Sequence, residues 1–382
     1  MIYLDAASTT KSNPKVIEAM MPYFTERWYN PSSLYSRANR VKEDIEEAKK
    51  TVADYIGAKS NEVFFTSGGS ESNCWVIQGF VNYWKSKGRT PVIVTSTIEH
   101  KSIMSCVENI DANVRYVGVN DDGLVDIQRL KKAILSAKIC GNEILVSIQF
   151  ANNELGTIQH IKEIAELAHR YDAVFHTDAV QAFGQTPIDV DELGIDMMSA
   201  SGHKIGTPKG IGFLYKRNGI SISPLIYGSQ MDGMRGGTEN VPYIIGMAKA
   251  VKLIQRDEEY NLRLTVLRNN FITQLKAIGC RVNGSLEERL PNNINVTFSQ
   301  DVTGESLIYM LDMCDIAVSA GSACNSKSIE PSYVLKAIGL SDEEAMKTVR
   351  ITLPHDITME QIDKAMCEIE KQIKLLAMKG DI

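Results

Sequence analysis

The chain has 382 residues, enough for two domains or one large α/β unit whose core needs no disulfide bonds. Hydrophobic residues make up 44% of the chain and charged residues 23%, a balance that excludes disorder, collagen and coiled coil. The formal charge of -6 argues against a protein that binds nucleic acid directly, because neutralising phosphates requires a basic surface.

The sequence also indicates the cellular compartment and whether a metal site is to be expected. No apolar run approaches the roughly 20 residues of a membrane-spanning helix, and the N-terminus lacks the basic and apolar regions of a signal peptide. The seven cysteines are scattered and form no CxxC pair. We therefore expect reduced thiols in a cytoplasmic protein without membrane contact. The Cys and His residues show no short ligand spacing, so we expect no metal site.

Between residues 60 and 215, short β-branched runs alternate with helical stretches. Such alternation predicts an α/β fold with a mostly parallel sheet flanked by helices. The predicted strands are 63–65, 91–94, 114–117, 144–148, 173–176, 196–199 and 212–215.

A long helical stretch near 240–280 could link two domains, and strands are predicted after it at 294–298, 316–318 and 349–352. Ser341 with Glu344, and Thr358 with Gln361, fit capping boxes that begin helices. The last helix has a stripe of apolar residues expected to face the core, namely Ile362, Met366, Ile369, Ile373 and Leu376. We expect a large α/β domain over 15–258 and a smaller α+β domain formed by 1–14 and 259–382.

The first segment with chemical meaning is 64–73, where a strand runs into a Gly-Ser loop and then a helical pattern. Small residues let backbone N–H groups approach an anion at a helix N-terminus, which predicts a phosphate cradle in this segment. The segment matches neither a Walker A loop nor GxGxxG. An ordinary strand–helix turn is the alternative.

Two further segments follow predicted strands, where ligands bind in open α/β sheets. Asp178 could pair with a protonated ring nitrogen, or it could cap the next turn. Lys204 lies among small residues, where a cleft would lower the pKa of its amine and make it a nucleophile. A surface lysine beside a loop is the alternative for Lys204.

Taken together, a phosphate cradle, a carboxylate and a lysine amine are what pyridoxal phosphate requires. Asp178 would keep the ring nitrogen protonated, and Lys204 would hold the cofactor as an imine. His100 and Asn153 also follow strands; His100 could lie over the ring, and Asn153 could contact the ring hydroxyl. Each of these two is otherwise a satisfied polar group in a loop.

Two residues in the C-terminal third fit the same chemistry. Cys324 lies among Gly, Ser and Ala, with little bulk to shield a nucleophilic thiol; a small buried cysteine in a turn is the alternative. Arg350, on a predicted strand, could clamp a substrate carboxylate with two parallel hydrogen bonds, or it could form a surface ion pair.

Ordered motifs along nearly the whole chain resemble those of the cysteine desulfurases of the NifS/IscS group, in the class V aminotransferase superfamily of fold-type I pyridoxal phosphate enzymes. The matching segments are 3–7, 30–33, 66–73, 152–154, 178–181, 201–204, 237–240 and 321–324. The resemblance implies the fold-type I architecture, with the small domain carrying the loop that holds Cys324.

The resemblance also implies a role for each matching residue. Lys204 would bind the cofactor covalently, Asp178 would pair with its ring nitrogen, His100 would stack on the ring, and Cys324 would take the substrate's sulfur as a persulfide, leaving alanine. The remaining cofactor and substrate contacts are implied for Gly69, Ser70, Asn153, Gln181, Ser201, His203, Asn30 and Arg350, and for Thr238 from the second subunit of a homodimer. The persulfide sulfur would pass to an acceptor protein, such as an iron–sulfur scaffold or a tRNA-thiolating enzyme.

Two other functions are compatible with these motifs. Selenocysteine lyase activity, or another pyridoxal-phosphate-dependent C–S lyase reaction, would use the same fold. A non-catalytic sulfur carrier would also keep the fold, but it would need neither Lys204 nor Asp178 nor His100.

Overall fold

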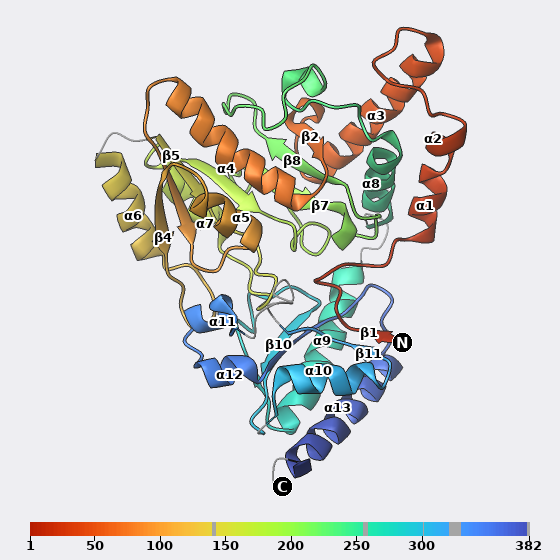
Figure 1. The fold of residues 1–382 in the computed structure, drawn as a ribbon, viewed down its shortest axis with the longest axis vertical. Coiled ribbons are helices and arrows are strands. Elements are labelled where there is room, and N and C mark those ends of the chain that lie inside the picture. Colours follow the sequence, from red (N-terminus) through yellow and green to blue (C-terminus); the bar gives the residue numbers. More distant parts are fainter. Residues whose placement is uncertain (140–142, 255–258, 301, 321–329, 380–382) are drawn as a thin grey trace.

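The computed structural model describes residues 1–139, 143–254, 259–300, 302–320 and 330–379, which form a larger and a smaller part (Figure 1). The helices are α1 Pro14–Met20, α2 Pro22–Thr25, α3 Ser36–Tyr55, α4 Gly69–Ser86, α5 Lys101–Glu108, α6 Ile127–Ile139, α7 Ile161–His169, α8 Val241–Ile254, α9 Tyr260–Ala277, α10 Gly304–Asp312, α11 Tyr333–Ala337, α12 Asp342–Met346 and α13 Met359–Lys379. Short 3-10 turns occur at Ser60–Glu62, Gly202–Lys204 and Met231–Gly233. Within these described ranges, no helix is long and apolar enough to cross a membrane.

The larger part is built on a seven-stranded sheet with the order β2-β8-β7-β6-β5-β3-β4. Its strands are β2 Val63–Thr66, β3 Pro91–Ser96, β4 Asn113–Val117, β5 Glu143–Ser147, β6 Val174–Asp178, β7 Met197–Ser201 and β8 Gly212–Lys216. Only β8 runs against its neighbours. The predicted mostly parallel sheet is confirmed, with each predicted strand present to within a few residues.

Helices cover both faces of this sheet, and the burial pattern follows from that arrangement. On β3, Val92 and Val94 pack into the core beneath α3, α6 and α7, whereas Ile93 packs with Trp75 and Phe80 of α4 on the other face. A parallel strand buried on both faces is expected to be a continuous β-branched run, as this one is.

The smaller part has its own apolar core around the antiparallel strands β9 Arg281–Val282, β10 Asn293–Thr297 and β12 Thr348–Thr352. The predicted apolar stripe of α13 packs into this core. Both predicted capping boxes are confirmed by reciprocal bonds, between Ser341 and Glu344 and between Thr358 and Gln361. The exact division of the chain into 15–258 and the remainder stays a prediction.

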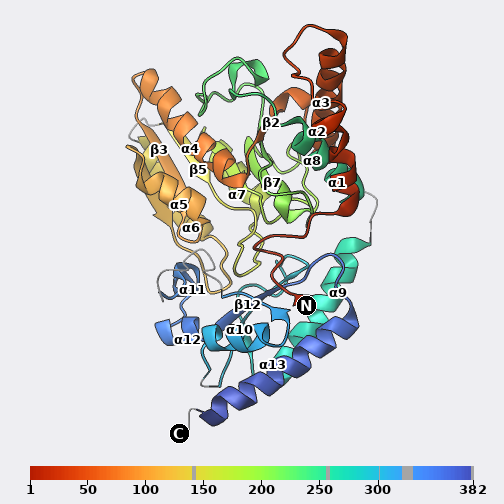
Figure 2. The ribbon, with the colours of Figure 1, turned by 45° about the vertical axis from the view of Figure 1, so that its right-hand side comes forward.

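The N-terminal segment connects the two parts (Figure 2). Its strand β1 Ile2–Tyr3 pairs in parallel with β11 Ile316–Ala317 in the smaller part. A few residues later, the Thr10 backbone N–H donates to the His203 carbonyl of the larger part at 2.9 Å. The sequence pattern predicted the two-residue strand β11 but not β1 or β9, since so short a segment shows no periodicity.

One buried histidine links three neighbouring strands in the middle of the large sheet by hydrogen bonds. His176 on β6 bonds the Ser147 hydroxyl on β5 at 2.9 Å and the Ser199 hydroxyl on β7 at 3.0 Å. Complete burial lowers the pKa of His176 to about 3. The imidazole is therefore neutral in the folded protein over the pH range in which an unfolded histidine becomes charged.

This burial makes the stability of the protein sensitive to acid. Because the folded pKa lies below the unfolded value, His176 stabilises the fold fully above about pH 6.5 and loses that contribution as the pH falls toward 3. Between pH 6 and pH 4 the unfolding free energy of the wild type should fall faster than that of His176→Gln by about 1.4 kcal/mol per pH unit. Urea titrations at several pH values measure this difference.

His169 provides a control of opposite sign. Its hydrogen bond to Asp196, at 2.8 Å, raises the pKa of His169. The stability from this pair is present below about pH 6.5 and is lost as the pH rises through the folded pKa. Above about pH 6.5, the difference in unfolding free energy between the wild type and His169→Gln should fall as the pH rises, opposite in sign to the slope for His176→Gln between about pH 6 and pH 4. A difference that rises with pH above about 6.5 would contradict the assignment of His169.

Candidate functional site

Most of the predicted site residues line one cavity of about 340 Å³. Chain segments at the carboxyl ends of β2, β3, β5, β6 and β7 form most of its wall, because these strands all run in the same direction. The lining includes Gly69, Ser70, His100, Asn153, Asp178, Gln181, Ser201, His203, Lys204 and Arg350. The large sheet thus brings together residues that are up to 135 positions apart in the sequence (69 to 204), and Arg350 joins them from β12 of the smaller part.

The N-terminus of α4 forms one side of the cavity. The N–H groups of its first turn, which begins at Gly69 and Ser70, have no partner within the helix. A Cβ atom at position 69 would clash with Cγ2 of Val180, so a larger residue here would require Val180 to move. The helix end therefore offers donors and a favourable potential for an anion. This geometry agrees with the predicted phosphate cradle.

A chain of hydrogen bonds joins Asp178 and His100 on the cavity wall. The Asn73 amide donates to Asp178 Oδ2 at 2.7 Å and to Ser102 Oγ at 2.9 Å. Ser102 Oγ lies 2.8 Å from His100 Nδ1, and the Ser102 backbone N–H donates to the same nitrogen at 3.1 Å. Because Nδ1 accepts, the proton of the neutral His100 ring is on Nε2. Asp178 also accepts from the Val180 N–H at 2.9 Å, so it caps a turn as well as lining the cavity.

The electrostatics of the cavity keep its histidines neutral. Burial lowers the pKa of His100, with Lys204 acting in the same direction and Asp178 opposing. Burial, Lys204 and Lys209 lower the pKa of His203 to about 4. Near pH 7 both rings therefore present neutral imidazoles to the cavity.

Lys204 is held by the N-terminal segment. Its Nζ donates to the carbonyls of Ala7 and Ser8, the latter at 2.8 Å. Gln181 donates to the same Ala7 carbonyl at 3.1 Å. These contacts place the lysine amine at the cavity wall rather than on a solvated face.

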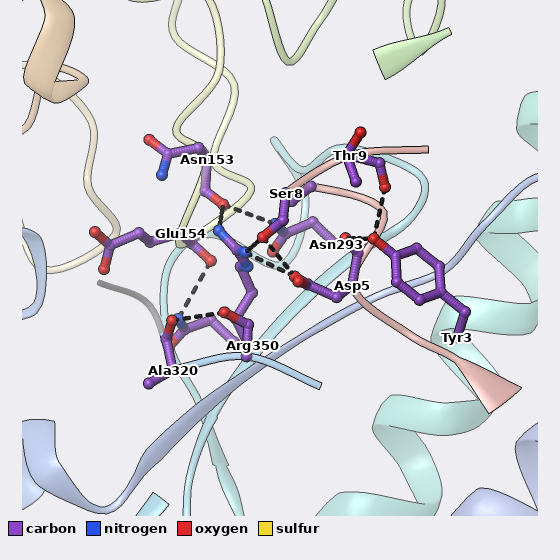
Figure 3. A network of polar contacts seen from close by, with 12 residues as sticks. Tyr3, Asp5, Ser8, Thr9, Asn153, Glu154, Asn293, Ala320 and Arg350 are labelled. Atoms are coloured by element: carbon purple, nitrogen blue, oxygen red, sulfur yellow. Dashed lines mark hydrogen bonds and ion pairs between the residues drawn. The ribbon is translucent and has the colours of Figure 1, made fainter. Parts of the chain in front are cut away.

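Arg350 lies on β12 with a side chain only 3% exposed, so the surface ion pair considered from the sequence is wrong. Its Nη2 donates to Asp5 Oδ1 at 2.8 Å and to Ser8 Oγ at 2.7 Å, and its Nη1 donates to the Asn153 carbonyl at 3.1 Å (Figure 3). With Nη2 occupied in this way, a carboxylate could not form the two parallel bonds expected from the sequence without displacing a partner.

Three predicted residues are not brought to this cavity by the described part of the chain. Asn30 and Thr238 are exposed and line no part of it. Cys324 lies outside the described residues.

Sequence reasoning overlooked the residues that support the site. Asn73 and Ser102 lie in segments that were singled out, but neither was assigned a contact; only the spatial pairing of α4 with α5 reveals their roles. A buried carboxyl was also missed: burial raises the pKa of Glu99 to about 8, against hydrogen bonds from Ser96 and Gln149. A single glutamate next to His100 shows no sign of burial in the sequence.

Comparison with known proteins identifies the family of this chain. The family model for aminotransferase class-V matches residues 2–365. The curated protein "Cysteine desulfurase IscS" of Dictyoglomus turgidum is 44% identical over 98% of this chain and 95% of its own length. The solved structure named "NIFS-LIKE PROTEIN" has a TM-score of 0.90 and 31% identity, covering 98% of this chain and 100% of that one. "SspA in complex with cysteine" has a TM-score of 0.82 and 37% identity, covering 93% and 99%.

The chain therefore belongs to the aminotransferase class-V family. Within that family it groups with the IscS and NifS-like proteins, which confirms the resemblance and the fold type predicted from the motifs.

The coupling across the cavity predicts how His100 titrates. Asp178 raises and Lys204 lowers the pKa of His100, in addition to the effect of burial. Asp178→Asn should therefore lower the His100 pKa further, and Lys204→Gln should raise it. NMR titration of the imidazole resonances measures both shifts. The resonance of His169, which pairs with Asp196 away from the cavity, should not change and is the internal control.

Proposed function

We propose that this chain is a pyridoxal-phosphate-dependent cysteine desulfurase that converts L-cysteine to L-alanine. The observation that carries the proposal is the single cavity in which Lys204, Asp178, His100 and Arg350 meet. The relatives named cysteine desulfurase, and the solved relative complexed with cysteine, support the same substrate. A selenocysteine lyase would use the same groups, and it differs from a cysteine desulfurase in which of the two amino acids it turns over.

The donor set of the cavity fits pyridoxal phosphate. The start of α4 at Gly69 and Ser70, with Ser201 and His203 nearby, would hold the phosphate. Asp178 would hold a proton at the ring nitrogen, and Lys204 would bind the aldehyde carbon. Asn153 and Gln181 would contact the ring hydroxyl. When bound, the cofactor supplies an electron-withdrawing ring that weakens bonds at the substrate's α-carbon.

The protein's own groups prepare the site for this chemistry. The Asn73 amide donates to Asp178 Oδ2 and the Val180 N–H donates to Oδ1, and these bonds hold the carboxyl group in place to accept from a ring N–H. His100 is neutral, with its proton on Nε2 and with Nδ1 engaged by Ser102, so the Nε2–H is the edge left to donate a hydrogen bond. Arg350 provides the positive charge for the substrate carboxylate.

Cys324 would then attack the substrate sulfur as a thiolate, forming an enzyme persulfide and leaving alanine. The persulfide sulfur would pass to an acceptor protein in iron–sulfur cluster assembly or tRNA thiolation. The cytoplasmic location also stays a prediction.

The proposal predicts the products and the residues they require. The protein loaded with pyridoxal phosphate should convert L-cysteine to L-alanine and, with a thiol reductant, sulfide in equal amounts. Cys324→Ala should reduce this activity more than about 100-fold, because removing a nucleophile usually costs orders of magnitude, and should leave the cofactor absorbance intact. Lys204→Ala should abolish both. Cys367→Ala is the matched control, because Cys367 is an exposed free cysteine on α13.

Other outcomes would point elsewhere. Pyruvate in place of alanine would identify a lyase that eliminates across the Cα–Cβ bond. Full activity of Cys324→Ala on selenocysteine, with little wild-type turnover of cysteine, would support the selenocysteine lyase. A protein that binds no pyridoxal phosphate would revive the sulfur-carrier function.

We also propose that the protein is a homodimer whose subunits share their sites. Asn30 and Thr238 are exposed and away from their own cavity, yet each lies near exposed apolar side chains. Trp28 and Leu34, 65% and 95% exposed, flank Asn30, and Ile226 and Tyr227 lie in the segment before Thr238. Apolar groups of this size exposed together are typical of a surface covered in an assembly.

A mixed dimer tests this sharing. Thr238→Ala should weaken cofactor binding about 10-fold or more, the usual cost of losing a bond to a charged group. A dimer with one Thr238→Ala subunit and one Lys204→Ala subunit should regain one site with the wild-type cofactor affinity, because Thr238 would come from the other chain. Failure to regain that site, or a monomer in sedimentation, contradicts the proposal.

A further inference from the structure

The guanidinium of Arg350 already forms an ion pair with a carboxylate of this chain, that of Asp5. Asp5 Oδ1 accepts from Nη2 at 2.8 Å and from the Ser8 hydroxyl at 2.9 Å, while Ser8 Oγ itself accepts from Nη2 at 2.7 Å (Figure 3). The three groups form a closed triangle. Both hydrogens of Nη2 therefore have acceptors within the chain.

The backbone fixes this triangle on both sides of Asp5. The Thr352 N–H donates to the Leu4 carbonyl at 2.7 Å, and the Ala6 N–H donates to the Thr352 carbonyl at 3.1 Å. Tyr3 also supports this segment, because its hydroxyl oxygen lies 2.9 and 2.7 Å from the carbonyl oxygens of Asp5 and Thr9, which share its one hydrogen. Asp5 is thus held beside Arg350 by the sheet rather than by a flexible loop.

The two other nitrogens of the Arg350 guanidinium, Nε and Nη1, differ in their hydrogen-bond partners. Among the described residues, Nε is buried and donates to no acceptor. Nη1 donates to the carbonyl of Asn153, a residue of the cavity wall, and has a second hydrogen. Nη1 is therefore the nitrogen from which the cavity can receive a hydrogen bond.

We propose that Asp5 is a positioning residue that holds Arg350 through Nη2, leaves Nη1 for the substrate carboxylate, and limits how tightly that carboxylate binds. The inference rests on the proposed function for the identity of the substrate. Asp5 has two opposing effects: its hydrogen bonds orient the guanidinium, and its negative charge reduces the attraction of Arg350 for a second carboxylate. The negative charge of Asp5 therefore repels the carboxylate of the substrate amino acid, and equally that of the alanine product, and lowers the affinity for both.

Two substitutions separate the two effects. Asp5→Asn keeps an accepting oxygen and removes the charge, so the Kd for L-alanine and the KM for L-cysteine should fall at least about threefold. Ser8→Ala keeps the charge and removes one bond to Nη2, so both constants should rise several-fold with little change in kcat. A residue needed only for folding would not move the constants in opposite directions.

The measurement is calorimetric titration of the protein loaded with pyridoxal phosphate, using L-alanine and then ethylamine, which lacks the carboxylate. Only L-alanine binding should respond to the substitutions. Asp312→Asn, an exposed carboxylate at the end of α10, makes the same charge change as a control and should have no effect. Thermal unfolding of each variant confirms that it is folded.

The proposal is overturned if Asp5→Asn weakens L-alanine binding or leaves it unchanged, or if ethylamine binding shifts equally. It is also overturned if the wild type does not bind L-alanine. Because binding requires no turnover, a wild type that binds L-alanine but makes none from L-cysteine would contradict the desulfurase function and leave the result for Asp5 standing.

Discussion

The pairing of the N-terminal segment with β12 is the interaction on which the candidate site depends. Backbone bonds between Leu4, Ala6 and Thr352 bring this segment from the smaller core to the edge of the large sheet. There the carbonyls of Ala7 and Ser8 hold Lys204, and the Ser8 hydroxyl holds Arg350. The two cationic side chains come from different cores, and one short stretch of chain sets the position of both.

The sequence predicted the large sheet well because its strands are buried on both faces. A run such as 91–94 is apolar and mostly β-branched because the strand is buried on both faces, and alternation with helices then implies a parallel sheet. The two-residue strand Ile2–Tyr3 could not be found in this way, since its pairing with Ile316–Ala317 depends on residues more than 300 positions away. Its place is set by tertiary packing rather than by local pattern.

The same distinction between local pattern and tertiary packing applies to the residues of the candidate site. His100, Asp178 and Lys204 were predicted because each follows a strand, and the ends of parallel strands meet at one edge. Asn73 and Asp5 were not assigned contacts, because an amide on a helix and a carboxylate near a terminus have many ordinary roles. Their contacts depend on how α4 meets α5 and on how residue 5 meets residue 350. Chemistry-bearing residues are thus easier to predict than the residues that orient them.

The shared amide of Asn73 has a consequence for how protons can travel. An amide group donates hydrogen bonds but does not release its hydrogens near neutral pH, so the path from Asp178 through Asn73 to Ser102 and His100 is not a proton wire. The carboxylate and the imidazole sense each other's charge through space while their protons stay separate. Under the proposed function, no proton would therefore pass between the two groups along this path while both contact the cofactor.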